Sequence, residues 1–209
     1  MNPNRVLLSV PTRGQIQWAT VTRLQEIRDA GGYPPVEYQP GNLSVAQTRN
    51  RIVRTFLAGD YDVLVMVDDD IVPSPMFLDR VLPLQDGWGM VALPHPMPHP
   101  ADRSRLILTV YDDDLRPLAP ELGLHECAYV ATGCVAIARE AIEAIGSAPF
   151  RINADPEAEI TSDDFLFCQD IRNEGFRVGY WHDGWYADHQ TVTSLAPLME
   201  ATTLERSTT

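Results

Sequence analysis

The feature that most constrains the fold is a short apolar run that ends abruptly in three aspartates. Residues 63–67 read Val-Leu-Val-Met-Val, and Asp68, Asp69 and Asp70 follow directly. A run this short, with β-branched residues at alternate positions, predicts a strand buried on both faces, which is typical of a mostly parallel sheet. Ligands of open α/β sheets bind outside the carboxyl ends of the strands, so we expect the three carboxylates to border a ligand site.

The three aspartates differ in the direction that a strand would give them. With a period of two, Asp68 and Asp70 point to one side and Asp69 to the other. Two carboxylates on one side suit a hard divalent cation, Mg²⁺ or Mn²⁺, which keeps coordination positions open for phosphate oxygens. The alternative is a solvated acidic turn that binds no ligand.

Predicted strands alternate with predicted helices before this run. Apolar periodicity and turn residues predict a strand at 5–10, a helix at 16–30, a strand at 36–38 and a helix at 45–58 that Ser44 caps. This order argues for right-handed βαβ crossovers. The predicted fold class is therefore α/β, with a Rossmann-like, mostly parallel central sheet flanked by helices.

The second half of the chain is expected to be less regular. A segment rich in proline, 94–100, does not suit a central strand, and we expect an exposed loop that carries His95 and His99. A second acidic triplet, at 112–114, predicts a solvated hairpin turn. The remaining predicted elements are helices at 76–82 and 139–145 and one beginning at 161–164, strands at 88–93, within 105–111 and 126–138, and at 176–181, and a loop at 150–160.

The length of 209 residues favours one domain with a sizeable core. We expect a single domain at 1–193, with a nucleotide-binding half at 1–93 and an acceptor half at 94–193, and a polar tail at 194–209. The chain shows no apolar stretch of about 18 residues and no cleavable leader, so a cytoplasmic protein is expected.

The charge balance disfavours one class of partner. The chain has 29 acidic and 16 basic residues, which gives a formal net charge of −13. Such a surface repels the backbone of duplex DNA or RNA. A nucleotide is still compatible as a small ligand, because a divalent metal supplies the positive charge that a diphosphate needs. The cysteines Cys127, Cys134 and Cys168 form no CxxC pair, so we expect buried thiols.

Two further groups of residues have the chemistry of a transfer reaction. Asp163 and Asp164 begin a predicted helix, where they either cap it or include a general base for an acceptor hydroxyl. His182 and His189 flank an aromatic segment, and either is a candidate for a third metal ligand or for an ordinary surface histidine. The aromatic side chains between them line a sugar pocket or belong to the core.

Two arginines are candidates for a nucleotide pocket. Arg13 follows the first predicted strand, and Arg49 lies on the helix that precedes the acidic strand. A guanidinium pairs with phosphate or stacks on a base. The alternative is surface charge, which we favour for Arg51.

Taken in order, these residues resemble the motifs of GT-A glycosyltransferases, of the compact, family-2-like kind found in bacteria and bacteriophages. The resemblance covers residues 5–192, and His189 matches the late metal-binding histidine of that family better than His182 does. The matching segments are Pro11-Thr12-Arg13, Gln47-Thr48-Arg49-Asn50, Val67-Asp68-Asp69-Asp70 as the DxD motif, Thr132-Gly133-Cys134-Val135-Ala136-Ile137 and Ser162-Asp163-Asp164-Phe165-Leu166-Phe167-Cys168.

The resemblance implies a GT-A fold with a small antiparallel subsheet on the acceptor side. It also implies transfer of a sugar from a nucleoside-diphosphate sugar, with Mn²⁺ or Mg²⁺ as the cofactor. The acceptor would be a protein, a glycan or a modified nucleobase, in the host cytoplasm if a phage encodes the chain.

The resemblance also assigns roles to residues. Asp70 and His189 would bind the metal, and Asp68 would bind the ribose, or the metal through water. Asp164 would be the base of an inverting reaction, with Asp163 beside it. The expected nucleotide-sugar site comprises Pro11, Thr12, Arg13, Arg49, Asp68, Asp69, Thr132 and Gly133.

Two departures from the family pattern leave alternatives open. After the second strand only Glu37 stands where an acidic nucleoside-binding run is usual, which leaves the donor base open. The acid pair is Asp-Asp where Glu-Asp is usual, so a retaining reaction is an alternative. A sugar-phosphate nucleotidyltransferase is another, although its phosphate loop is normally richer in glycine than the loop with Gly14. A non-catalytic sugar-binding module is the third.

Overall fold

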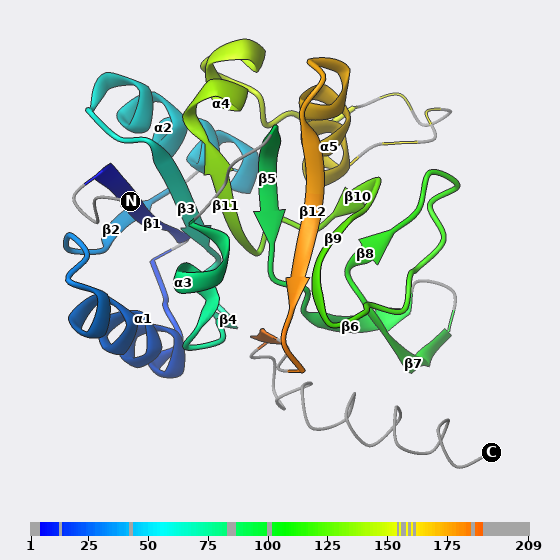
Figure 1. Cartoon of the computed structure of the whole chain (residues 1–209), viewed down its shortest axis with the longest axis horizontal. Helices are drawn as coiled ribbons and strands as arrows, with labels where there is room; N and C mark the ends of the chain where they lie inside the picture. Colours follow the sequence, from blue (N-terminus) through cyan, green and yellow to red (C-terminus); the bar gives the residue numbers. More distant parts are fainter. Residues whose placement is uncertain are drawn as a thin grey trace.

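A seven-stranded sheet with helices on both faces forms the centre of the molecule (Figure 1). The computed structural model describes residues 5–189, except 13, 42–43, 83–86, 100–101, 154, 156–157, 159, 161 and 185–186. The strands lie in the order β2, β1, β3, β11, β5, β12, β9. Their bounds are β1 Val6–Thr12, β2 Glu37–Pro40, β3 Val63–Val67, β5 Trp88–Ala92, β9 Gly123–Glu126, β11 Cys134–Ala138 and β12 Arg177–His182.

Five of these seven strands run in the same direction. β1 pairs in parallel with β2 and β3, and β5 pairs in parallel with β12. β11 is antiparallel to both β3 and β5, and β9 is antiparallel to β12. The predicted fold class, a mostly parallel central sheet flanked by helices, is confirmed. β11 comes from the second half of the chain yet lies between β3 and β5, so both halves build one sheet.

The alternation of side chains along β3 explains why the sheet is covered on both faces. Leu64 and Met66 face one apolar core with helices α2, α4 and α5, whereas Val63, Val65 and Val67 face a second core with α1 and α3. The helix bounds are α1 Trp18–Gly31, α2 Val45–Ala58, α3 Phe77–Val81, α4 Arg139–Ile145 and α5 Asp163–Asn173. Helices α2 and α4 have the predicted bounds.

Three small antiparallel pairs of strands complete the described fold. They match the expectation of antiparallel structure beside the main sheet. The pairs are β4 Ile71–Val72 with β13 Asp188–His189, β6 Pro96–His99 with β7 Asp102–Leu108, and β8 Val110–Tyr111 with β10 Tyr129–Val130.

The structure corrects the prediction for the proline-rich segment. Residues 94–96 are buried, and Pro96–His99 forms strand β6 against β7. A two-stranded ribbon accepts proline because each strand is an edge, where the missing N–H groups can face away from the partner strand. His95, expected on an exposed loop, is only 7% exposed. The side chain of His99 lies outside the described part of the chain.

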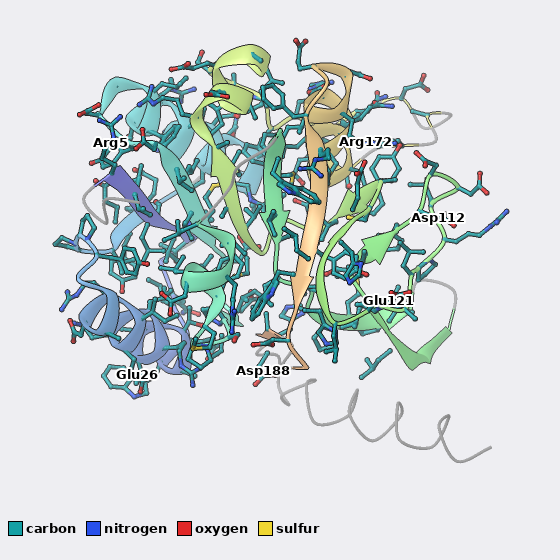
Figure 2. The ribbon with its side chains drawn as sticks, viewed as in Figure 1. Arg5, Glu26, Asp112, Glu121, Arg172 and Asp188 are labelled. Carbon is teal, nitrogen blue, oxygen red and sulfur yellow. The ribbon has the colours of Figure 1, made fainter. Side chains whose placement is uncertain are left out.

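Other expectations about the second half hold in outline. The triplet at 112–114 is a turn in which Asp112 Oδ1 accepts hydrogen bonds from the backbone of Asp114 and Arg116, and Figure 2 shows Asp112 at the edge of the molecule. All three cysteines are buried and free. The tail at 194–209 lies outside the described residues. Within those that are described, no helix is long and apolar enough to cross a membrane.

Candidate active site

A cleft opens where β1 and β3 end beside the first turn of α2. Its volume is about 250 Å³. Typical ligand pockets measure roughly 300–1,000 Å³, so the cleft has room for only part of a nucleotide sugar. It is lined by Pro11, Thr12, Val45, Thr48, Asp68, Asp69 and Asp70.

The wall of the cleft around Thr12 is held by hydrogen bonds. Thr12 Oγ1 accepts from the N–H of Gly14 at 3.0 Å, and its carbonyl accepts from the N–H of Gly41 at 2.9 Å. Gly41 in turn lies so close to Thr48 that an added Cβ would be 2.0 Å from Thr48 Oγ1. Pro11 and Thr12, two residues of the expected nucleotide-sugar site, line the cleft, whereas Arg13 lies outside the described residues.

The three aspartates of the acidic triplet border the cleft in a turn. β3 ends at Val67, and residues 69 and 70 form a turn. The turn is closed by a hydrogen bond of 3.1 Å from the N–H of Ile71 to the carbonyl of Asp68. The expected strand alternation, with Asp69 pointing away, therefore does not hold. The carbonyl of Asp69 accepts from the N–H of Gln17, and the N–H of Asp68 donates to Gly133. These bonds join the triplet to α1 and to the turn before β11.

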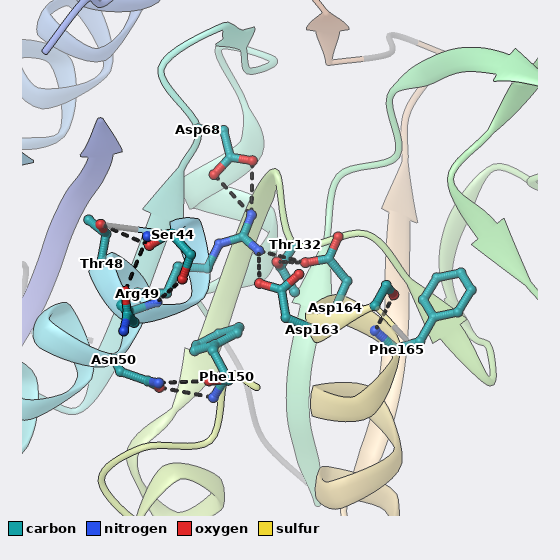
Figure 3. A network of polar contacts seen from close by, with 12 residues as sticks. Ser44, Thr48, Arg49, Asn50, Asp68, Thr132, Phe150, Asp163, Asp164 and Phe165 are labelled. Carbon is teal, nitrogen blue, oxygen red and sulfur yellow. Dashed lines mark hydrogen bonds and ion pairs between the residues drawn. The ribbon is translucent and has the colours of Figure 1, made fainter. Parts of the chain in front are cut away.

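Arg49 gathers three carboxylates around one buried guanidinium (Figure 3). Its Nη2 donates to both oxygens of Asp68, at 3.1 and 2.9 Å. Its Nη1 donates to Asp163 at 2.9 Å and to Asp164 at 2.7 Å. The Arg49 side chain is 4% exposed and does not line the cleft. Arg49 thus joins the acidic triplet to the start of α5, and its expected contact with the donor stays a prediction.

The charges of this cluster do not balance. Burial raises the pKa of Asp68 to about 6, although Arg49 opposes the shift. Burial also raises the pKa of Asp163 against the same opposing charge. Burial alone would lower the pKa of Arg49, but the three carboxylates outweigh it and raise that pKa. One positive and three negative charges in partly dry surroundings favour an additional cation or proton.

Ser162 leaves both acids of α5 available to the cluster. Its side chain accepts from the N–H of Phe165 at 3.3 Å and so caps the helix, a role considered for Asp163 or Asp164. Thr132 Oγ1 donates to Oδ1 of Asp164, the same oxygen that Arg49 contacts. Oδ2 of Asp164 makes no hydrogen bond to any described residue. Thr132 thus lies beside Asp164, the predicted base.

Asn50, the neighbour of Arg49 on α2, anchors the chain segment that precedes α5. Its side-chain amide donates to the carbonyl of Phe150 at 2.7 Å and accepts from the N–H of Phe150 at 2.9 Å. The guanidinium of Arg49 lies 5.6 Å from the centre of the Phe150 ring. Two adjacent residues of α2 therefore fix both ends of the segment 150–164 that leads to the acids.

His189 rather than His182 lies against the acidic triplet. Its Nε2 is 3.3 Å from Oδ2 of Asp70, and β13 places it opposite Ile71. The hydrogen bond to Asp70 raises the pKa of His189. Burial would raise the pKa of Asp70, but the bond and charge of His189 lower it. His182 is buried at the end of β12, where burial lowers its pKa.

Asp70 and His189 fit a divalent cation as a pair of ligands. Two ligand atoms that are each about 2.1 Å from an octahedral ion, at right angles, lie about 3.0 Å apart. The observed separation of 3.3 Å is close to this value. Asp68 does not join them, since both its oxygens contact Arg49. In the described ranges, no set of three or more His, Cys, Asp or Glu side chains is arranged to hold a metal ion.

His95 is the residue of the site that sequence reasoning missed. Its ring meets the ring of His189 edge-on, with 5.4 Å between the centroids. Burial, with the charge of His189, lowers the pKa of His95 to about 4. A sequence signal existed, because His95 follows a predicted strand at the sheet edge where the acidic triplet also lies. The proline content of residues 94–100 instead favoured the prediction of an exposed loop.

Comparison with known proteins establishes the fold only. No protein-family model and no curated protein matches the sequence. Protein A197 from STIV has a TM-score of 0.60 at 20% identity, over 92% of this chain and 90% of that chain. A CMP:2-keto-3-deoxy-manno-octonic acid synthetase complexed with CTP has a TM-score of 0.56 at 11% identity, over 99% of this chain and 100% of that chain. The 4-diphosphocytidyl-2C-methyl-D-erythritol synthase from Anaerococcus prevotii has a TM-score of 0.53 at 13% identity, over 98% of this chain and 100% of that chain.

Proposed function

We propose that this chain is a metal-dependent glycosyltransferase that moves a sugar from a nucleoside-diphosphate sugar to an acceptor hydroxyl. One observation supports the proposal above the others. A single buried guanidinium, Arg49, joins a carboxylate of the donor cleft, Asp68, to the two acids that begin α5. Glycosyl transfer needs donor and acceptor groups at a fixed separation, and this arrangement provides it.

The donor would enter the cleft with its nucleoside against Pro11 and Thr12. Val45 and Thr48 also line the cleft. Arg13 keeps its expected role as a nucleoside contact. Because the cleft holds about 250 Å³, the sugar would extend from it toward Thr132 and Gly133.

Asp70 and His189 would hold Mn²⁺ or Mg²⁺ beside the diphosphate. The bound ion supplies positive charge to the leaving diphosphate. Arg49 holds the carboxylate of Asp68 in the lining of the cleft, where it would bind the ribose, or the metal through water. The excess negative charge of the site supports a cation at this position.

Asp164 would take the proton from the acceptor hydroxyl. Arg49 and Thr132 both contact Oδ1, which fixes the carboxylate and leaves Oδ2 for the acceptor. The acceptor oxygen forms a bond to the anomeric carbon while the bond from that carbon to the diphosphate oxygen breaks. The proton passes to Asp164, and attack from the opposite side inverts the configuration. Asp163, held by the same guanidinium, is the alternative base.

A sugar nucleotidyltransferase is the second candidate. Two structures that share the fold over nearly the whole chain carry names of synthetases for cytidylyl compounds. Against this candidate, the loop after β1 has one glycine, Gly14, where a phosphate loop is normally richer in glycine.

Product analysis separates these candidates. A glycosyltransferase releases a nucleoside diphosphate from a nucleotide sugar, whereas a nucleotidyltransferase releases pyrophosphate from a nucleoside triphosphate and a sugar phosphate. We expect the first product and not the second, and pyrophosphate release alone would overturn the proposal. The anomeric configuration of the glycoside formed, or of the sugar freshly released by hydrolysis when water takes the place of the acceptor, is measured by proton NMR and distinguishes an inverting from a retaining reaction.

A further inference from the structure

His95 is fixed in place by Thr109. The backbone N–H of His95 donates to Thr109 Oγ1 at 3.2 Å, and its carbonyl accepts from the N–H of Thr109 at 3.2 Å. Nδ1 of the ring lies 3.5 Å from the same hydroxyl. Both the backbone and the ring plane of His95 are therefore set by the residue between β7 and β8.

A close approach to Gly133 limits the other side of the ring. A Cβ added to Gly133 would lie 2.8 Å from Cε1 of His95, closer than real contacts allow. Because Gly133 has no side chain, it leaves the space in which the imidazole lies. The carbonyl of Gly133 also accepts a hydrogen bond from the N–H of Asp68. Any larger side chain here would push the ring out of position.

The fixed ring of His95 meets His189 edge-on. The two rings are 5.4 Å apart at an interplanar angle of 83°. A ring packed edge-on against a neighbour that is itself held in place has less freedom to rotate about its Cβ–Cγ bond. Packing against His95 therefore favours the orientation in which Nε2 lies 3.3 Å from Asp70.

We propose that His95 is a positioning residue, which holds the His189 imidazole in the orientation that allows His189 and Asp70 to bind one divalent cation. This inference rests on the metal site of the proposed function. His95 acts through ring packing and touches neither donor nor metal. Residues that orient metal ligands change metal affinity by about 10- to 100-fold when they are mutated.

Titration of the full chain with Mn²⁺, followed by calorimetry, tests this role. His95→Ala is expected to weaken Mn²⁺ binding about 10-fold or more, whereas His95→Phe, which keeps a ring of similar shape, should recover most of the affinity. Gly133→Ala, which displaces the ring without removing it, should weaken binding in the same direction. His182→Ala is the matched control, because His182 is as buried as His95 but lies at the end of β12.

Each outcome decides between the two proposals. Failure of the unmodified chain to bind Mn²⁺ would overturn the metal site itself. Mn²⁺ binding that is equal in the unmodified chain and in folded His95→Ala would overturn only the role of His95. If His95→Ala fails to fold, equal weakening by His95→Phe and His95→Leu would contradict positioning by ring packing.

Discussion

The guanidinium of Arg49, whose side chain is 4% exposed, contacts both carboxylate oxygens of Asp68, a residue that lines the cleft, at 2.9 and 3.1 Å. The same guanidinium contacts Asp163 and Asp164, so the acidic triplet and the start of α5 share one buried cation. This relationship determines what mutations, pH and metal should do to the protein.

Removing the charge of Arg49 should destabilise the fold. Arg49→Met leaves three partly buried carboxylates without their common partner, which we expect to cost about 3–5 kcal/mol of the free energy of unfolding. Urea unfolding measures this loss. Arg51→Met, an exposed arginine on the same helix, is the control and should change stability by less than about 0.5 kcal/mol. Equal stability of the two variants would contradict the structural role of Arg49.

Asp68 should make the free energy of unfolding depend on pH. The pKa of Asp68 in the folded protein is raised to about 6 from 3.8, so the folded state holds this proton more tightly than the unfolded chain does. Its contribution to stability is therefore complete below pH 3.8 and is lost as the pH rises through about 6. Asp68→Asn should gain stability relative to the unmodified chain over this interval. Parallel stability curves from pH 4 to 7 would be inconsistent with a buried, protonatable Asp68.

Asn50 should stabilise the segment that leads to α5. Asn50→Ala removes both hydrogen bonds to the backbone of Phe150, and we expect a loss of about 1–3 kcal/mol in urea unfolding. Asn153→Ala serves as the control, because Asn153 is exposed and its side chain contacts only the nearby N–H of Asp155 among described residues. A loss no greater than that of the control would show that Asn50 does not anchor this segment.

Gly41 should be required by the packing of Thr48. The Cβ of Gly41→Ala would lie 2.0 Å from Thr48 Oγ1, and we expect the clash to cost about 1–3 kcal/mol. Thr48→Ala removes the hydroxyl, so the double variant should lose less than the sum of the single variants in a double-mutant cycle. Strict additivity would mean that the two residues do not contact each other as described.

Local sequence patterns were sufficient for the elements that present the site. The bounds of β3 and α2 follow from apolar periodicity, and in α2 Ser44 and Gln47 form the capping box that fixes its start. The family resemblance favoured His189 over His182 as a metal ligand, which stays a prediction, and the structure places the ring of His189 beside Asp70. Each of these predictions depends on neighbours in sequence or on a motif.

Relationships between distant segments were not predictable in this way. The burial of His95 depends on β7 and on Thr109, which no local pattern around 94–100 reveals. The bonds from Arg49 to Asp163 and Asp164 span 114 and 115 residues. Placement of β11 between β3 and β5 is likewise a property of the whole sheet. Tertiary pairing, rather than propensity, decides these features.

The most direct test of the proposed glycosyl transfer is turnover of nucleotide sugars. The full chain would be incubated with a panel of nucleotide sugars and Mn²⁺, and release of nucleoside diphosphate would be measured beside Asp70→Ala and a sample without metal. We predict release from at least one donor, dependent on Mn²⁺ and lost in Asp70→Ala. If no donor is turned over and none raises the melting temperature of the protein, the proposed glycosyltransferase activity is wrong.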